Sequence, residues 1–152
     1  MQSLLTVLDP NLVQTQQYFA SKKSALEKIS AEFAKHYSNL EVETLFKALM
    51  ARERLGSTGI GHGIAIPHCR ASGITQCIMG VFCLAYPVKF DAIDNQPVDI
   101  FIVLVVPEDE PKTHLELLAM IAERFKNQTF CTKIRDTLAA NEVYQLIIHY
   151  DV

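Results

Sequence analysis

Two near-continuous apolar runs constrain the fold of this chain more than any other feature of its sequence. They span residues 77–85 and 98–106 and are rich in β-branched and aromatic side chains. A strand that is covered on both faces of its sheet shows such a run, whereas a half-exposed strand alternates apolar with polar side chains. Residues 90–97, between the runs, have the polar composition of a turn that closes a hairpin. The chain is therefore predicted to form two central strands that need a helical layer on each face.

Apolar residues at helical spacing predict two helices before the first run. One is expected from Ser21 to about Tyr37, with Ser21 as its N-cap, and the other from about Glu41 to Arg54. Ser38 and Glu41 have the spacing of a capping box for the second helix. The short connection between the two helices predicts that they form a helical hairpin.

Helical periodicity also follows the second run. A helix is expected to open at Thr113, which has capping-box spacing to Glu116. Its predicted apolar face consists of Leu115, Leu118, Ile121, Ala122 and Phe125. A further helical stretch carries Phe130, Ile134 and Leu138, and Asn141 is the predicted N-cap of a last helix. Helices before and after buried strands predict an α/β domain with helices on both faces, to which residues 12–13 add a short edge strand.

Composition and charge exclude several classes of function. The 152 residues carry a net charge of −3 with no basic run and no tryptophan, so no nucleic-acid surface is expected. The most apolar segment, residues 100–106, is far shorter than the roughly 20 residues of a membrane span, and no export signal opens the chain. The four cysteines form no C-x-x-C pair and no zinc spacing, which is typical of reduced thiols. We therefore expect one cytoplasmic domain over residues 1–152, without membrane insertion.

The segment from Arg52 to Arg70 is the candidate functional site. It holds four of the six glycines of the chain, followed by a predicted short strand at residues 64–66. Closely spaced glycines let a backbone adopt positive φ and approach a ligand. Pro67 holds the chain extended and ends the predicted strand, so that His68 is held rigidly at its rim. A histidine fixed in this way is a candidate for chemistry.

His68 is the candidate nucleophile of this segment. A free histidine has a pKa of about 6.5, so a ring nitrogen is unprotonated near neutral pH. Backbone N–H groups of the glycine segment, including those at Gly61 and Gly63, are expected to cradle an anion. Arg52 and Arg70 are expected to offer bidentate donors to a phosphoryl group.

His114 is the second candidate. In the first turn of a helix it lies where free N–H groups and the helix dipole favour negative charge, so it is suited to hold an anion on His68. Taken alone, it is instead a partly exposed residue at a helix start. His62, His68 and Cys69 match no zinc spacing, so no metal is expected. No Gly-Lys-Ser/Thr follows the glycines, which disfavours a nucleotide-binding P-loop.

Residues 57–68, Ser-Thr-Gly-Ile-Gly-His-Gly-Ile-Ala-Ile-Pro-His, resemble the active-site signature of the EIIA domains of the fructose/mannitol class. These domains belong to the bacterial phosphoenolpyruvate-dependent phosphotransferase system. Residues 21–27, 90–99 and 112–115 are similar to the nitrogen-regulatory branch of the same family. The resemblance covers nearly the whole chain and implies a three-layer α/β/α domain around a mixed β-sheet.

The resemblance also implies roles for individual residues. It implies that His68 accepts a phosphoryl group on Nε2 and passes it on, that His114 hydrogen-bonds this group, and that Arg52 steadies it. Arg70 falls where relatives often carry a basic residue, and His62 falls at a variable position. The chain would then be a phosphotransferase component that works through a phosphohistidine intermediate, without a cofactor. Its phosphoryl donor would be a histidine-phosphocarrier protein of the nitrogen branch.

The sequence leaves three functions open. The first is a phosphorelay protein whose phosphorylation state regulates nitrogen-, potassium- or carbon-related targets, such as potassium transport or sensor-kinase components. The second is a sugar-specific EIIA component that passes phosphate to an EIIB domain, but the chain carries no EIIB-like cysteine motif. The third is a binding module in which His68 is never phosphorylated, which the joint presence of the site residues disfavours. In the first two functions, an apolar rim of Ile60, Ile64 and Ile66 is expected to exclude water and to dock partner proteins.

Overall fold

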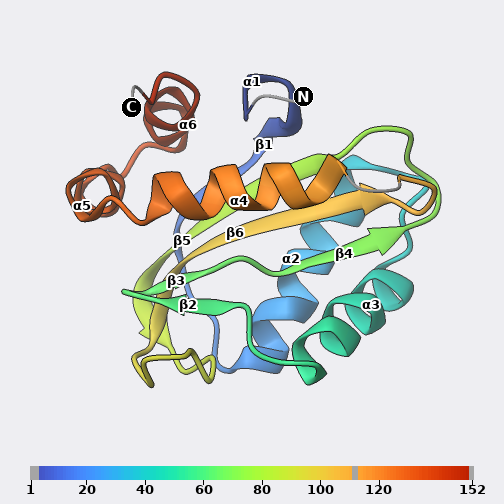
Figure 1. Ribbon diagram of the computed structural model, residues 1–152, viewed down its shortest axis with the longest axis horizontal. Coiled ribbons are helices and arrows are strands. Elements are labelled where there is room, and N and C mark those ends of the chain that lie inside the picture. Colours follow the sequence, from blue (N-terminus) through green and yellow to red (C-terminus); the bar gives the residue numbers. More distant parts are fainter. Residues whose placement is uncertain (1–3, 111–112, 151–152) are drawn as a thin grey trace.

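The computed structural model describes residues 4–110 and 113–150, which form a six-stranded sheet between two groups of helices (Figure 1). The strands are β1 (Leu8–Gln17), β2 (Gly59–Gly61), β3 (Ile64–Ala65), β4 (His68–Ala71), β5 (Ile78–Val88) and β6 (Val98–Pro107). The helices are α1 (Leu4–Val7), α2 (Lys22–His36), α3 (Val42–Arg54), α4 (Thr113–Phe125), α5 (Gln128–Asp136) and α6 (Ala140–Ile148). The predicted three-layer α/β/α architecture is confirmed. No helix in these ranges has the length and apolarity to cross a membrane.

The sheet is mixed, and its central strands are the two that the apolar runs predict. The strand order is β1-β5-β6-β3-β2, and β4 also pairs with β6. β5 and β6 are antiparallel neighbours, whereas β1 runs parallel to β5 at one edge. The predicted hairpin is confirmed, and the edge strand expected at residues 12–13 is part of the longer β1.

Alternate side chains of β5 and β6 build two separate cores, because successive residues of a strand point to opposite faces of the sheet. One core contains Met79, Val81, Ile100, Ile102 and Leu104, together with buried residues of α4, α5 and α6. The other contains Ile78, Phe82, Phe101, Val103 and Val105, together with buried residues of α2 and α3. Both faces are covered, which is why the two runs are apolar at nearly every position.

β3 and β4 are two parts of one strand that Pro67 interrupts. Ile64 pairs with Ile100 and His68 pairs with Leu104, so both parts keep the same register along β6. Proline has no N–H to donate, but the Pro67 carbonyl still accepts the N–H of Leu104 at 3.0 Å. The strand predicted at residues 64–66 therefore ends one residue early, at Ala65, and after Ile66 and Pro67 it resumes with His68.

The helix caps follow the predictions in part. Ser21 caps α2, since its hydroxyl accepts the N–H of Ser24 at 3.0 Å. The capping box predicted at Ser38 is wrong, because Glu41 is the N-cap of α3 and makes no capping hydrogen bond through its side chain. The N-cap predicted at Asn141 is also wrong, since α6 starts earlier at Ala140. Both errors come from polar residues two or three positions away from the true N-cap.

The buried face of α4 also differs from the prediction. Leu117, Ile121 and Phe125 are buried, whereas Leu115 is 61% exposed. Both sets of residues have helical spacing, so periodicity alone does not decide between them. Leu138 follows the end of α5 and is exposed rather than buried. The capping box predicted at Thr113 involves a side chain outside the described part of the chain.

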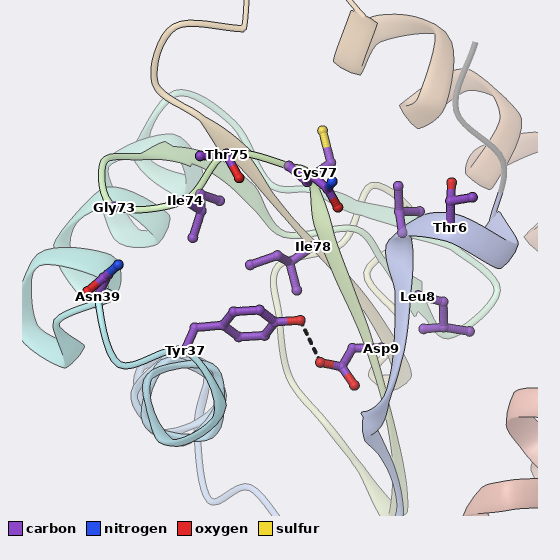
Figure 2. Close-up of a pocket in the computed structure, with 12 residues that line it drawn as sticks. Thr6, Leu8, Asp9, Tyr37, Asn39, Gly73, Ile74, Thr75, Cys77 and Ile78 are labelled. Carbon is purple, nitrogen blue, oxygen red and sulfur yellow. Dashed lines mark hydrogen bonds between the residues drawn. The ribbon is translucent and has the colours of Figure 1, made fainter.

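Tyr37 ties the end of α2 to the start of β1 at the wall of a hollow of about 350 Å³ (Figure 2). Its hydroxyl donates to Oδ2 of Asp9 at 2.5 Å, and the N–H of Asn11 donates to Oδ1 at 2.8 Å. Burial and the neighbouring carboxylate raise the pKa of Tyr37, so the phenol remains a donor throughout the physiological pH range. This hollow shares no lining residue with the His68 pocket described below.

Replacing Tyr37 with phenylalanine is expected to lower the free energy of unfolding by about 1–2 kcal/mol, because the variant removes the donor and leaves the half-buried Asp9 carboxylate with one partner fewer. Urea denaturation followed by circular dichroism measures this change. Tyr86→Phe is the matched control, since Tyr86 is 70% exposed. Equal stabilities of the two variants would contradict a stabilising role for the Tyr37–Asp9 bond.

Candidate active site

His68 opens β4 at a point where β4 lies between β6 and α3 (Figure 1). A pocket of about 490 Å³ lies there, bounded by the end of α3, by β4 and by the start of α4. It is lined by Ala48, Ala51, Arg52, Leu55, His68, Cys69, Arg70, Val106 and His114. The pocket therefore brings together all four basic side chains that the sequence predicts for the site.

The hydrogen bond of His68 distinguishes its two ring nitrogens. Nδ1 lies 2.8 Å from the carbonyl oxygen of Ile66, within the interruption between β3 and β4. A carbonyl oxygen only accepts hydrogen bonds, so Nδ1 carries a proton in this contact. The neutral ring then has its lone pair on Nε2. Nε2 is therefore the ring nitrogen that could act as a nucleophile.

The surroundings of His68 keep its ring neutral. Burial is the main cause that lowers the pKa of His68 below the ordinary 6.5. The Ile66 carbonyl opposes this effect, while the nearby positive charge of Arg52 adds to it. At neutral pH the ring is thus unprotonated at Nε2, as nucleophilic attack requires.

Arg70 holds the segment that leads into α4. Its Nη1 donates to the carbonyl oxygens of Pro107 and Glu108, both at 3.4 Å, and to that of Glu110. Its Nη2 lies 3.4 Å from Nδ1 of His114. A guanidinium only donates, so Nδ1 of His114 accepts and the proton of the neutral ring is on Nε2.

His114 is therefore a hydrogen-bond donor to the pocket, in contrast to His68. Burial lowers the pKa of His114, and the charge of Arg70 adds to this shift. A neutral His114 that donates from Nε2 complements a neutral His68 whose Nε2 has a lone pair. The two histidines thus suit one reaction, in which one attacks and the other stabilises the transferred anion.

Arg52 is in the last turn of α3 on the wall of the pocket. Its Nη1 donates to the carbonyl oxygen of Gly56 at 2.8 Å. This bond uses one of the five N–H donors of a guanidinium. Arg52 thus has a fixed place beside His68 and has donors to offer to an anion.

Residues 6–150 match the family described as "Phosphoenolpyruvate-dependent sugar phosphotransferase system, EIIA 2". The chain belongs to this family. Among curated proteins, this EIIA domain is 45% identical over 145 residues to the nitrogen regulatory protein of Escherichia coli K12, covering 95% of this chain and 88% of that protein. It is 44% identical over 128 residues to the nitrogen regulatory protein of Pseudomonas aeruginosa, covering 84% and 83% of the two chains.

Solved structures agree with this assignment. The nitrogen regulatory protein IIA-Ntr from Neisseria meningitidis superposes on this EIIA domain with a TM-score of 0.88 at 34% sequence identity, covering 95% of this chain and 99% of the other. The mannitol IIA protein of Escherichia coli superposes with a TM-score of 0.76 at 18% identity, covering 91% and 97%. The second likeness concerns the fold alone.

The glycine turn of this EIIA domain does not border the His68 pocket. Gly61 and Gly63 flank the turn between β2 and β3 with φ of 99° and 82°, and neither lines the pocket. Gly63 lies instead against the ion pair between Asp99 and Arg135. The proposal that Gly61 and Gly63 bind a phosphoryl group stays a prediction, and no contact with the pocket supports it.

His62 lies on the same turn, away from the pocket of His68. Its N–H donates to Oδ2 of Asp94 at 2.9 Å, and its Nδ1 lies 3.4 Å from Nε2 of Gln128. Within residues 4–110 and 113–150, no three His, Cys, Asp or Glu side chains are grouped so as to hold a metal ion.

The predicted apolar rim is wrong. Ile64 and Ile66 are only 1% and 5% exposed, and they pack in the core that faces α4. Ile60 is exposed on β2 but does not line the pocket. The apolar lip of the pocket is Leu55, which is 85% exposed. The sequence does carry a signal for Leu55, because it directly follows the last residue of α3, outside the buried stripe of that helix.

Proposed function

We propose that this EIIA domain is a cytoplasmic phosphorelay protein that accepts a phosphoryl group on Nε2 of His68 from a histidine-phosphocarrier protein. The single observation that carries the proposal is the 2.8 Å contact between Nδ1 of His68 and the Ile66 carbonyl. It leaves the Nε2 lone pair for the pocket that Arg52, Arg70 and His114 also line.

In the proposed step, Nε2 of His68 attacks the phosphorus of the phosphohistidine on the carrier. An Nε2–P bond forms as the N–P bond of the carrier breaks, and the electron pair of the broken bond returns to the carrier's imidazole. The His68 ring gains positive character, which the Ile66 carbonyl stabilises through the Nδ1 proton. Arg52 and the Nε2–H of His114 are placed to neutralise the phosphoryl oxygens. Such a loose, in-line transfer depends mainly on positioning and charge stabilisation.

We propose further that the output of the relay is regulatory. The support is that relatives at 44–45% identity over most of the chain are named nitrogen regulatory proteins, whereas the mannitol protein is only 18% identical. The phosphorylation state of His68 would then decide which regulatory target is bound, for example a potassium-transport or sensor-kinase component. The alternative is a sugar-specific EIIA component that passes the group to an EIIB domain.

Phosphoryl transfer tests both proposals. The purified chain is mixed with phosphoenolpyruvate, the first enzyme of the relay and the carrier protein of either the nitrogen or the sugar branch. Acid-labile phosphate on the chain is followed by intact mass. Faster labelling from the nitrogen-branch carrier supports the regulatory relay, and faster labelling from the sugar-branch carrier supports the transport component. No labelling from either carrier would refute phosphoryl transfer.

The lowered pKa of His68 predicts how the site responds to pH. Protonation of Nε2 removes the nucleophile. Because the pKa of His68 is lowered, phosphoryl acceptance is expected to persist just below pH 6.5 and to be lost only at lower pH. The unfolded chain binds this proton more readily than the folded one, so folding stability contributed by His68 is present above pH 6.5 and declines as the pH falls below it. NMR titration of the His68 Cε1–H signal measures the shift. A midpoint at or above the ordinary 6.5 would contradict it.

A further inference from the structure

A buried carboxylate follows Arg52 in α3 and takes no part in the proposed chemistry. Glu53 is the next residue of α3, and its side chain is only 2% exposed. Charged side chains are almost never fully buried unless they are paired. The partners of Glu53 therefore indicate what it holds in place.

Glu53 connects α2, α3 and the segment that follows α3. The backbone N–H of Thr58 donates to both carboxylate oxygens, at 3.1 and 3.3 Å, and the Thr58 hydroxyl donates to Oε2. Nζ of Lys22, at the start of α2, lies 3.0 Å from Oε1. Lys22 also donates to the Phe90 carbonyl at 3.4 Å and lies 4.6 Å from the centre of the Phe90 ring.

The segment that Glu53 fixes at Thr58 also holds Arg52. Gly56 lies between the two, and its N–H donates to the Glu53 carbonyl at 3.1 Å. The Gly56 carbonyl in turn accepts from Nη1 of Arg52 at 2.8 Å. A shift of residues 55–58 would therefore move the carbonyl that fixes the Arg52 guanidinium.

Stability alone is a weak reason for such an arrangement. A buried ion pair loses so much hydration energy that well-packed apolar side chains often stabilise a protein equally well. Misplacing a group that stabilises a transition state by about 1 Å, in contrast, slows a reaction by up to roughly 100-fold.

We infer that Lys22, Glu53 and Thr58 form a positioning network that fixes the Arg52 guanidinium beside His68. The inference rests on the phosphoryl-transfer function proposed above, in which Arg52 neutralises the transferred group. None of the three residues lines the pocket, so they act through the Gly56 carbonyl rather than by contact with the phosphoryl group.

A double-mutant cycle on the full chain distinguishes positioning from general support of the fold. Glu53→Gln keeps the shape of the side chain but loses the charge that pairs with Lys22, and we expect the single-turnover rate at saturating carrier to fall about tenfold. In an Arg52→Ala chain, Glu53→Gln is expected not to lower the transfer rate any further. Equal losses in both backgrounds would overturn the inference. Glu43→Gln, on the exposed side of α3, is the matched control.

Thr58 gives a second test in case Glu53→Gln folds poorly. Thr58→Ser keeps the hydroxyl donor and is expected to transfer at the wild-type rate, whereas Thr58→Val loses it and is expected to be slowed like Glu53→Gln. A Thr58→Val chain that transfers as fast as Thr58→Ser would overturn the hydroxyl's role.

A measurement on the unphosphorylated chain separates failure of the network from failure of the proposed function. The NMR signals of the Arg52 Nη–H groups are expected to be shifted and protected from exchange in the wild type, because Nη1 donates to the Gly56 carbonyl. In Glu53→Gln they are expected to move to the position of those of the exposed Arg54. An Arg52 signal that is unchanged in Glu53→Gln overturns the inference, whatever the labelling result. Absence of labelling in the wild type refutes the proposed function alone.

Discussion

Replacing His68 with glutamine is expected to abolish phosphoryl acceptance, with a rate at least roughly 10³-fold below wild type, because no other group supplies the attacking lone pair. The amide of glutamine is similar in size to imidazole and can still donate to the Ile66 carbonyl. Its nitrogen has no lone pair free for attack, so the variant removes the nucleophile and keeps the packing. We expect its free energy of unfolding to stay within about 1 kcal/mol of wild type.

Two matched variants make this result specific. His36→Gln changes an exposed histidine at the end of α2 and is expected to leave the rate unchanged. His114→Gln keeps an N–H donor for the phosphoryl oxygens but loses the ring geometry, so we expect an intermediate loss of about tenfold. Single-turnover labelling from the phosphorylated carrier, followed by intact mass, compares all three. Labelling of His68→Gln at the wild-type rate would refute the assignment of the phosphoryl acceptor.

The sequence predicts the centre of the fold well, because a strand buried on both faces has a continuous apolar run that can be recognised locally. The runs that become β5 and β6 are apolar at nearly every position, whereas an amphipathic helix or a half-exposed strand has polar positions at regular spacing. β4 has no such apolar run, since its sequence His-Cys-Arg-Ala is mixed and carries no strand pattern. It is a strand only because β6 lies alongside it in the register that β3 has already set.

The candidate active site likewise combines residues that their local sequence predicts with contacts that only the fold creates. His68 is predictable from its neighbours along the chain, and His114 from its place in the first turn of a helix. The hydrogen bond from Arg70 to the Glu110 carbonyl joins residues 40 positions apart. No local pattern encodes such a contact. The predicted isoleucine rim fails for a similar reason, because only the position of α4 decides that Ile64 and Ile66 are covered.

The sequence allows two explanations for Gly63: its N–H binds an anion, or its lack of a side chain serves the backbone. Gly63 has a φ of 82°, and a Cβ there would lie 2.6 Å from Nη2 of Arg135 and 2.7 Å from Oδ1 of Asp99. Its carbonyl accepts the N–H groups of Asp99 and Ile100 at 2.9 and 3.1 Å. The structure therefore gives Gly63 a backbone role, in which a missing side chain lets β3 approach the ion pair closely.

Gly63→Ala is accordingly expected to lower the free energy of unfolding by roughly 2–3 kcal/mol, from backbone strain at positive φ and from displacement of the Arg135 side chain. Urea denaturation measures the loss. In an Arg135→Ala chain the clash with Nη2 of Arg135 is gone while the one with Oδ1 of Asp99 stays. The same substitution is therefore expected to cost less there, about 1–2 kcal/mol. The folded variant is expected to accept phosphate at the wild-type rate, because the turn does not line the His68 pocket. A stable Gly63→Ala chain with slowed transfer would instead favour the anion-binding role that the sequence predicts for this glycine.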